Sequence, residues 1–125
     1  MQYVDGFVVP VPKTKLKAYL DMAKKGAKVW MDHGALEVRE AVADDVKVGK
    51  RTSFPRSVKL KGGETVVFSW IVYKSRVHRD RVMAEVMKDP RLADMMDPKK
   101  AAVRRQADDY GRIQHPRCQL APTSE

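Results

Sequence analysis

The sequence predicts an α+β domain, in which an antiparallel sheet is covered by helices. Residues 64–87 (ETVVFSWIVYKSRVHRDRVMAEVM) change from a hydrophobic period of two to a period of about 3.6 near Ser75, as in a strand that leads into a helix. Both faces of the predicted strand 65–73 are largely apolar, so we expect both faces to be covered. The helix that follows can cover one face, and the cover of the other has to come from elsewhere.

Two more strands precede this unit. Residues 3–11 (YVDGFVVPV) are rich in β-branched side chains, and we expect Pro10 and Pro12 to close the strand, since proline donates no hydrogen bond to a sheet. In residues 35–42 (ALEVREAV) the side chains alternate between the two faces of a strand, and Leu36, Val38, Glu40 and Val42 share one face. We expect this second strand to lie nearer a sheet edge than the third.

The helices have recognisable ends. Residues 14–33 carry apolar side chains at helical spacing, with Thr14 as the expected N-cap and Gly34 as the expected residue just past the end. Ser75 is the expected N-cap of a helix over 75–88, and Pro90 begins one or two further turns that reach Met96. These bounds put one main helix after the first predicted strand and the other after the third.

A long connection over residues 44–63 separates the second and third strands. Within it we expect TSFPRSVKL to form an extended arm, with Phe54 and Val58 packed against the sheet. The order of elements is then strand, helix, strand, strand, helix. This is a ferredoxin-like βαββαβ arrangement with its last strand missing.

Composition predicts one soluble domain. The chain has 125 residues, 33% charged and 43% hydrophobic, without an apolar run that could span a bilayer. Its N-terminus does not have the pattern of a signal peptide, since Asp5 interrupts a run that no basic residue precedes. With Cys118 as its one cysteine, it can form no internal disulfide, and we expect a cytoplasmic protein.

The net charge of +9 raises the question of nucleic-acid binding. The basic residues are scattered among acidic ones, without a dense stripe or interleaved aromatic residues of the kind that bind single strands. We therefore do not expect specific nucleic-acid binding. Weak nonspecific attraction at low salt is the stronger expectation.

The stretches YVDGFVVPVP, KVWMDHGALE, ADDVKVGKRTSFPRSVKLKGGETVVFSWIVYKSRVHRDRV and MKDPRLADMMDP closely resemble the YbaA-like family of uncharacterised bacterial proteins. The resemblance covers residues 1–98. It implies a protomer of the dimeric α/β-barrel superfamily, with helices on one face of an antiparallel sheet and a homodimer formed through the other face. The partner's sheet would then supply the second cover for residues 65–73. The family has no established activity.

After residue 98 the chain departs from this family. Relatives continue with a motif similar to Met-Pro-Phe-Asp-Gly-Lys-Arg-Met and a last strand, whereas this chain reads KKAAVRRQADDYGRIQHPRCQLAP. One permissible set of codons for residues 102–119, read one base later, gives PFDGKRMITAGFSILVV. We therefore hypothesise a frameshift near Lys100 or Ala101, and we treat 1–98 as the domain. We expect residues 99–125 to be an atypical, poorly ordered tail that supplies no strand, apart from a short helix over 101–109.

The search for chemistry is mostly negative. The sequence has no phosphate-binding glycine loop, no metal-spaced cluster of cysteine and histidine, and no nucleophile elbow, so we expect no metal and no cofactor. We expect His33, at the C-terminal end of the first helix, to carry a charge that the helix dipole favours. Asp44 and Asp45 are expected to form a solvated turn, and Trp30 is expected to pack in the core. The side chains selected for a candidate pocket are Arg56, Trp70, Tyr73 and His78.

Two classes of function remain open, and catalytic residues stay unassigned. The first is an enzyme or binder of a small molecule that uses the space between sheet and helices, as other members of the superfamily do, which is an analogy of fold. The second is a non-catalytic dimeric module for interaction or regulation. Convergent polar groups in a deep pocket would favour the first class. A filled cleft with an apolar outer patch would favour the second.

Overall fold

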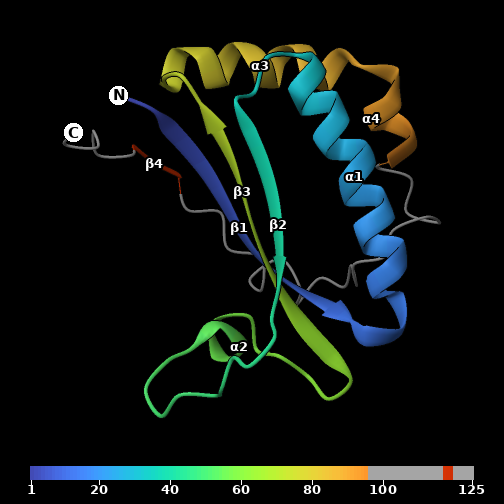
Figure 1. Cartoon of the computed structure of the whole chain (residues 1–125), viewed down its shortest axis with the longest axis vertical. Helices are drawn as coiled ribbons and strands as arrows, with labels where there is room; N and C mark the ends of the chain where they lie inside the picture. Colours follow the sequence, from blue (N-terminus) through green and yellow to red (C-terminus); the bar gives the residue numbers. More distant parts are fainter. Residues whose placement is uncertain (96–116, 120–125) are drawn as a thin grey trace.

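A computed structural model of the protein describes residues 1–95 and 117–119. Its elements are β1 (Tyr3–Pro12), a 3-10 helix (Lys13–Lys15), α1 (Leu16–Asp32), β2 (Glu37–Val42), α2 (Phe54–Ser57), β3 (Glu64–Tyr73), α3 (Arg76–Lys88), α4 (Pro90–Met95) and β4 (Arg117–Gln119). In Figure 1, α1 runs alongside the strands, α3 crosses above their ends, and α4 turns down beside α1.

The strands form one sheet in the order β2-β3-β1-β4, in which every neighbouring pair is antiparallel. The two central strands pair along their whole length, from Tyr3 opposite Tyr73 to Pro12 opposite Glu64. The order is that of a ferredoxin-like sheet, so the predicted α+β fold is confirmed. The predicted place of the second strand near an edge is confirmed as well.

The helices cover one face of the sheet. On this helix-facing side, Tyr3, Ile71 and Tyr73 pack against Val29 of α1, Val82 and Val86 of α3 and Leu92 of α4. A second group on the same side joins Val9, Val11 and Val67 to Tyr19 of α1. Because side chains alternate along a strand, the intervening residues of β1 and β3 point to the opposite face.

The opposite face is packed at one end by the long connection. Val58 is fully buried there against Val8 and Val66, as predicted. Phe54 remains 46% exposed, although its ring stacks on that of Phe68 at 5.7 Å. The arm is also not wholly extended, because Ser53 accepts a hydrogen bond from the main-chain nitrogen of Arg56 and begins the single turn of α2.

Most helix ends lie where the sequence placed them. Gly34 follows α1 with a φ of 109°, and the hydroxyl oxygen of Ser75 caps α3 by accepting from the main-chain nitrogen of His78 at 3.1 Å. The expected cap at Thr14 is wrong. That residue lies within the 3-10 helix Lys13–Lys15, and no side chain caps α1, which begins at Leu16.

The expectation that the tail supplies no strand is wrong for residues 117–119. They pair with β1, with Tyr3 opposite Gln119 and Asp5 opposite Arg117, in the position of the missing last strand. Pairing between main chains does not require alternating apolar side chains, and the ladder contains neither Pro116 nor Pro122. The predicted short helix over 101–109 lies outside the described residues.

Within the described part of the chain, no helix combines the length and the apolar character needed to cross a membrane.

Candidate functional site

Several polar side chains lie on the helix-facing side of the sheet, where a simple core would be apolar. Asp5, Ser69 and Tyr73 belong to the central strands and are all buried. Glu40 of β2 is opposite Ser69 in the register, so it belongs to the same face. These residues divide into a buried ion-pair group and a group at the sheet edge.

The ion-pair group joins the first strand to the third helix. Asp5 accepts a hydrogen bond from Nε of Arg79 at 3.0 Å, and the two side chains are only 7% and 11% exposed. Nη1 of Arg79 also donates to the exposed carboxylate of Asp80 at 2.8 Å. A buried charge is stable only when it is paired, so Asp5 and Arg79 depend on each other.

Tyr73 and Trp30 complete this group. The Tyr73 hydroxyl is fully buried and has Trp30 and Asp5 as polar neighbours. Burial, followed by the negative charge of Asp5, raises the pKa of Tyr73 well above its ordinary value, so the hydroxyl keeps its proton. Neither this hydroxyl nor Nε1 of Trp30 makes a well-formed hydrogen bond to the described residues, and each has a proton to donate.

The edge group consists of Tyr19, Glu40 and Ser69. The hydroxyl of Tyr19 on α1 donates to Oε2 of Glu40 at 3.1 Å, and the hydroxyl of Ser69, opposite Glu40 in the register, is a polar neighbour of the Glu40 carboxylate. Burial raises the pKa of the Glu40 carboxyl above its ordinary value, and the two hydroxyls only partly oppose that shift. A carboxylate with a raised pKa binds a proton more tightly than an ordinary glutamate does, which favours a role in proton transfer.

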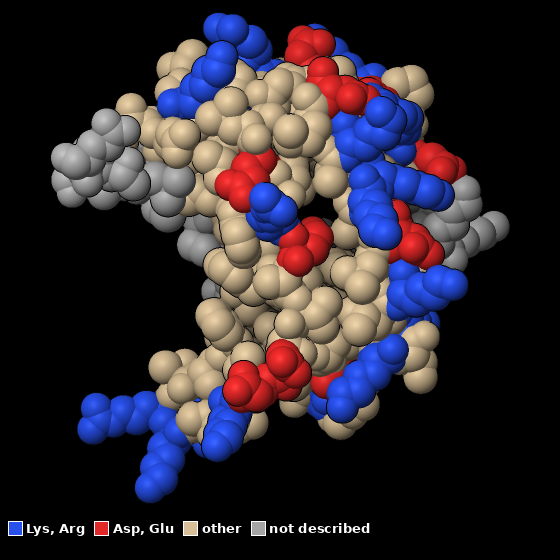
Figure 2. Space-filling view, in the orientation of Figure 1, with Lys and Arg blue, Asp and Glu red and all other residues tan. Residues whose placement is uncertain are grey.

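The edge group is open to solvent. β2 is the outer strand of the sheet, and Glu40 as a whole residue is exposed, although its carboxylate contacts buried neighbours. Figure 2 shows a deep opening on this side of the molecule, between the charged side chains that lie over β2 and those that lie over α1. A small molecule could therefore approach the edge group from outside.

The structure brings together two of the four residues of the candidate pocket. The ring centroids of Tyr73 and His78 lie 6.2 Å apart in a T-shaped arrangement, with the ring planes at 75°. Trp70 is on the opposite face of the sheet, 5.4 Å from the ring of Phe68, and Arg56 is in α2 beside that face. Since Trp70 and Tyr73 are an odd number of residues apart in one strand, they point to opposite sides.

His78 is partly buried and accepts a hydrogen bond at Nδ1 from the main-chain nitrogen of Lys74 at 3.0 Å. Desolvation, with smaller contributions from the charges of Lys74 and Arg81, lowers the pKa of the His78 imidazole. The neutral form of the ring is therefore favoured at neutral pH.

His33 has a structural partner rather than only a helix dipole. Its Nε2 lies 2.8 Å from Oδ2 of Asp89, which also binds Arg91 at 2.8 Å. Hydrogen bonds from Arg91 and then His33 hold the pKa of the Asp89 carboxyl well below its ordinary value. Oδ1 of Asp89 accepts from the main-chain nitrogen of Arg91, so this group fastens the start of α4 to the end of α1.

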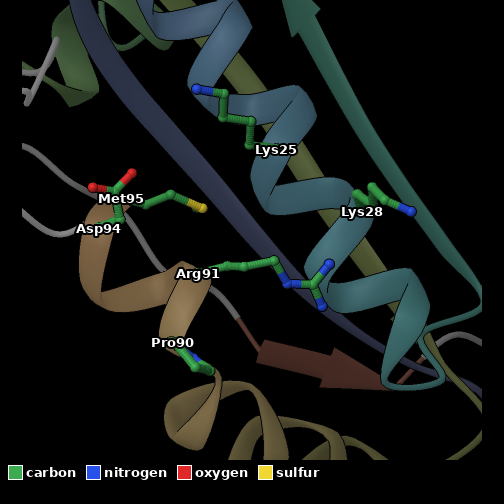
Figure 3. A pocket seen from close by; sticks show the side chains of 6 residues that line it. All are labelled: Lys25, Lys28, Pro90, Arg91, Asp94 and Met95. Atoms are coloured by element: carbon green, nitrogen blue, oxygen red, sulfur yellow. The ribbon is translucent and has the colours of Figure 1, made fainter.

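A separate cavity of about 410 Å³ lies between α1 and α4 (Figure 3). Lys25 and Lys28 of α1 face Arg91 and Asp94 of α4 across it, and Pro90 and Met95 complete the lining. Lys28 and Arg91 both bind Asp32, at 3.6 and 2.8 Å, so much of the positive charge is already compensated. We therefore assign this cavity to the packing of two helices.

Sequence reasoning did not select Asp5, Arg79, Tyr19, Glu40 or Ser69. Two signals were available. Asp5 interrupts an apolar strand, and Glu40 occupies an apolar face of the alternating segment 35–42.

No group of three or more potential metal ligands occurs within residues 1–95.

The fold and this polar lining define a class: a ferredoxin-like α+β protein with charged and hydroxyl side chains between its sheet and its helices. The family model described as "Protein of unknown function (DUF1428)" matches residues 2–102, and the chain belongs to that family.

Two similar proteins are both named "Uncharacterized protein YbaA". The one from Escherichia coli strain K12 and the one from Shigella flexneri are each 48% identical to this chain over 94 residues, which is 75% of this chain and 80% of the relative. A solved structure described as a dimeric ferredoxin-like protein, from an uncultured marine organism, matches with a TM-score of 0.56 and 13% identity, over 99% of this chain and 100% of that chain. At this identity the match shows the fold alone.

Proposed function

We propose that the protein is a cytoplasmic homodimer that binds a small molecule in the space between β2 and α1. The observation that carries the proposal is the edge group: Glu40, an exposed residue opposite Ser69, accepts a hydrogen bond from Tyr19, and its strand borders an opening to solvent. Polar groups that converge at the mouth of an apolar cleft are typical of ligand sites. The single cysteine supports a reducing compartment.

The cost of the edge group supports a role beyond packing. Placing a carboxylate against buried neighbours costs stability unless its hydrogen bonds compensate for lost water. The raised pKa of Glu40 indicates that the two hydroxyls do not compensate fully. An aliphatic residue at this position would continue the apolar face that Val38 begins. A glutamate here lowers folding stability, which favours a role beyond packing.

The other face of the sheet supports the proposed homodimer. Phe68 and Trp70 are only partly buried there, and Phe54, whose ring stacks on that of Phe68, is 46% exposed. Apolar side chains grouped in this way usually mark an interface. The description of the solved structure as dimeric supports the same arrangement.

A ligand screen tests the small-molecule proposal. Thermal shift against a library of small organic compounds should identify compounds that raise the unfolding midpoint of the full chain. Glu40→Gln and Tyr19→Phe should weaken their binding in calorimetry, while Asp80→Asn on the exposed side of α3 should not. Hits that bind all three variants equally, or a screen without hits, would contradict the proposed site.

Light scattering tests the dimer. The full chain should have twice the protomer mass, and Trp70→Arg should convert it to a monomer. Met87→Arg provides a matched control, because Met87 is 62% exposed on α3, away from the sheet face. A monomeric wild-type protein, or an effect of both variants, would be inconsistent with the proposed interface.

The second candidate function is a non-catalytic dimeric interaction module. The exposed apolar residues of the connection 44–63 favour it, because a partner protein could cover them. Replacing Val48 with serine should then weaken partner capture without changing the response to small molecules. Specific nucleic-acid binding has less support, since basic side chains over α1 alternate with acidic ones in Figure 2.

A further inference from the structure

The position of Glu40 suggests a more specific role than binding. Its Oε2 is fixed by the Tyr19 hydroxyl at 3.1 Å, and its strand lies at the sheet edge. The carboxylate thus accepts a hydrogen bond from α1 while its residue remains exposed to solvent on the outer strand. A fixed, accessible carboxylate is the arrangement that proton transfer requires.

The surroundings of the edge group restrict what could bind there. Tyr19 belongs to an apolar cluster with Val9, Val11 and Val67, so the interior side of the edge group is apolar. Nearby on β2, Arg39 and Glu37 bind each other at 2.7 Å, so their charges are mutually compensated. An ionised Glu40 would repel anions, and apolar neighbours make the loss of hydration costly for any charged ligand, so neutral, largely apolar molecules are the favoured class.

We propose that Glu40 is a general base that removes a proton from a neutral, flat, largely apolar small molecule, with Tyr19 as its positioning residue. This inference rests on the proposed binding site between β2 and α1. In the reaction the carboxylate takes the proton from an acidic C–H or O–H bond of the substrate. The electron pair of that bond remains on the substrate, and the protonated Glu40 later returns the proton to product or to water.

A chromogenic probe tests the proposal directly. 5-Nitrobenzisoxazole is neutral and flat, and a base removes the hydrogen on its C3. The C–H electron pair then forms the nitrile π bond, the N–O bond breaks, and its electron pair leaves on the coloured phenolate. We expect the full chain to accelerate this elimination over free acetate at equal concentration, with a rate that rises with pH as Glu40 ionises.

Three variants make the test specific. Glu40→Gln should lower the protein's rate by about 10²-fold, which is typical of a lost general base. Glu37→Gln on the same strand should leave it unchanged. Tyr19→Phe should move the midpoint of the pH–rate profile upward, since the Tyr19 hydrogen bond lowers the pKa of the Glu40 carboxyl. Circular dichroism of each variant controls for folding.

The outcomes separate this inference from the proposed function. 6-Nitrobenzotriazole has a similar shape but cannot eliminate, so calorimetry with it measures binding alone. Binding without acceleration, or equal rates for wild type and Glu40→Gln, would overturn the role of Glu40 as a base while leaving the binding site in place. A lack of both binding and turnover would also overturn it, and the library screen would then decide the proposed function independently.

Discussion

At the scale of single residues, Asp5 and Arg79 are the most constrained polar side chains of the fold. Each is buried, and each has the other as a charged partner at 3.0 Å. Removing one member leaves the second charged in a site that water reaches poorly. Removing the buried partner of Arg79, Asp5, should therefore lower the unfolding free energy more than removing its exposed partner, Asp80.

Asp5→Ala should destabilise the protein by about 3–5 kcal/mol, because the guanidinium of Arg79 would lose its buried partner. Asp80→Asn is the matched control, since Asp80 also binds Arg79 but its side chain is 54% exposed. It should cost about 1 kcal/mol or less. Urea unfolding measures the unfolding free energy of both variants. Similar decreases would show that the buried pair contributes no more to stability than the exposed pair.

Glu40 makes a prediction about pH. Its folded-state pKa is raised above the ordinary value of 4.5, so the folded protein binds the proton more tightly than the unfolded chain does. The unfolding free energy should therefore fall as pH rises from about 4.5 through the folded-state pKa. Glu40→Gln should lack this fall and gain stability relative to wild type between pH 4 and pH 7.

Urea unfolding at a series of pH values measures the effect, with Glu37→Gln as the control for a glutamate of the same strand that pairs with Arg39. If wild type and Glu40→Gln gave parallel curves across this range, the carboxyl would have the same proton affinity in both states.

At the scale of elements, the turn from α1 into β2 depends on one glycine. Gly34 has a φ of 109°, and a Cβ there would lie 3.4 Å from Nε2 of His78 and 3.9 Å from Val82. The turn therefore combines an unusual main-chain conformation with close contact to α3. Its geometry sets where β2, and with it Glu40, lies relative to the helices.

Gly34→Ala should destabilise the fold by about 1–3 kcal/mol, the usual cost of such a conformation for a residue with a side chain. Gly62→Ala is the control, because a Cβ at Gly62 meets nothing within 4 Å and its φ is not positive. Thermal unfolding of the two variants should differ clearly. Equal midpoints would mean that the turn relaxes without cost.

The main elements were predictable because their signals are local. Each signal depends only on residues that are close in sequence: the strand periodicity over residues 64–73, the serine before α3 and the glycine after α1. The start of α1 was not predictable in this way, since a 3-10 helix replaced the expected cap at Thr14. The turn of α2 within the connection was missed for a similar reason.

The candidate site was less predictable than the fold because its partners are distant in sequence. Tyr19 and Glu40 meet only when α1 packs beside β2, and Asp5 meets Arg79 only when α3 packs on the sheet. Periodicity identifies a polar residue on an apolar face, but it does not identify what that residue will contact. The four side chains of the candidate pocket do not meet for a simpler reason, because they were chosen from both faces of β3.

At the scale of the whole molecule, the sheet has a defined place for a fourth strand. Arg117–Gln119 pair with Tyr3–Asp5. In a chain with the restored strand, the same register would set positions 110–118 opposite residues 12–4. The shifted reading frame places TAGFSILVV at those positions. Its Phe and Ile would fall opposite Val9 and Phe7, on the helix-facing side of β1.

A chain that carries PFDGKRMITAGFSILVV at positions 102–118 should therefore unfold at a higher temperature and be more soluble than the present chain. A longer β4 would pair with most of β1 and protect its edge. Differential scanning calorimetry and soluble yield provide the comparison. Sequencing of the locus tests the frameshift itself, and codons that do not encode this string one base later would exclude it.

The ion pair between Asp5 and Arg79 also has a consequence for how the chain folds as it is synthesised. The two residues are 74 positions apart, and a ribosome releases the first strand long before the third helix. Until α3 emerges, docking β1 into a closed core would bury a carboxylate without its cation. We therefore expect nascent chains that end at Tyr73 to remain sensitive to protease, and protection to appear only once Arg79 has left the exit tunnel. The pair thereby delays closure of the core until nearly all of its elements have been made.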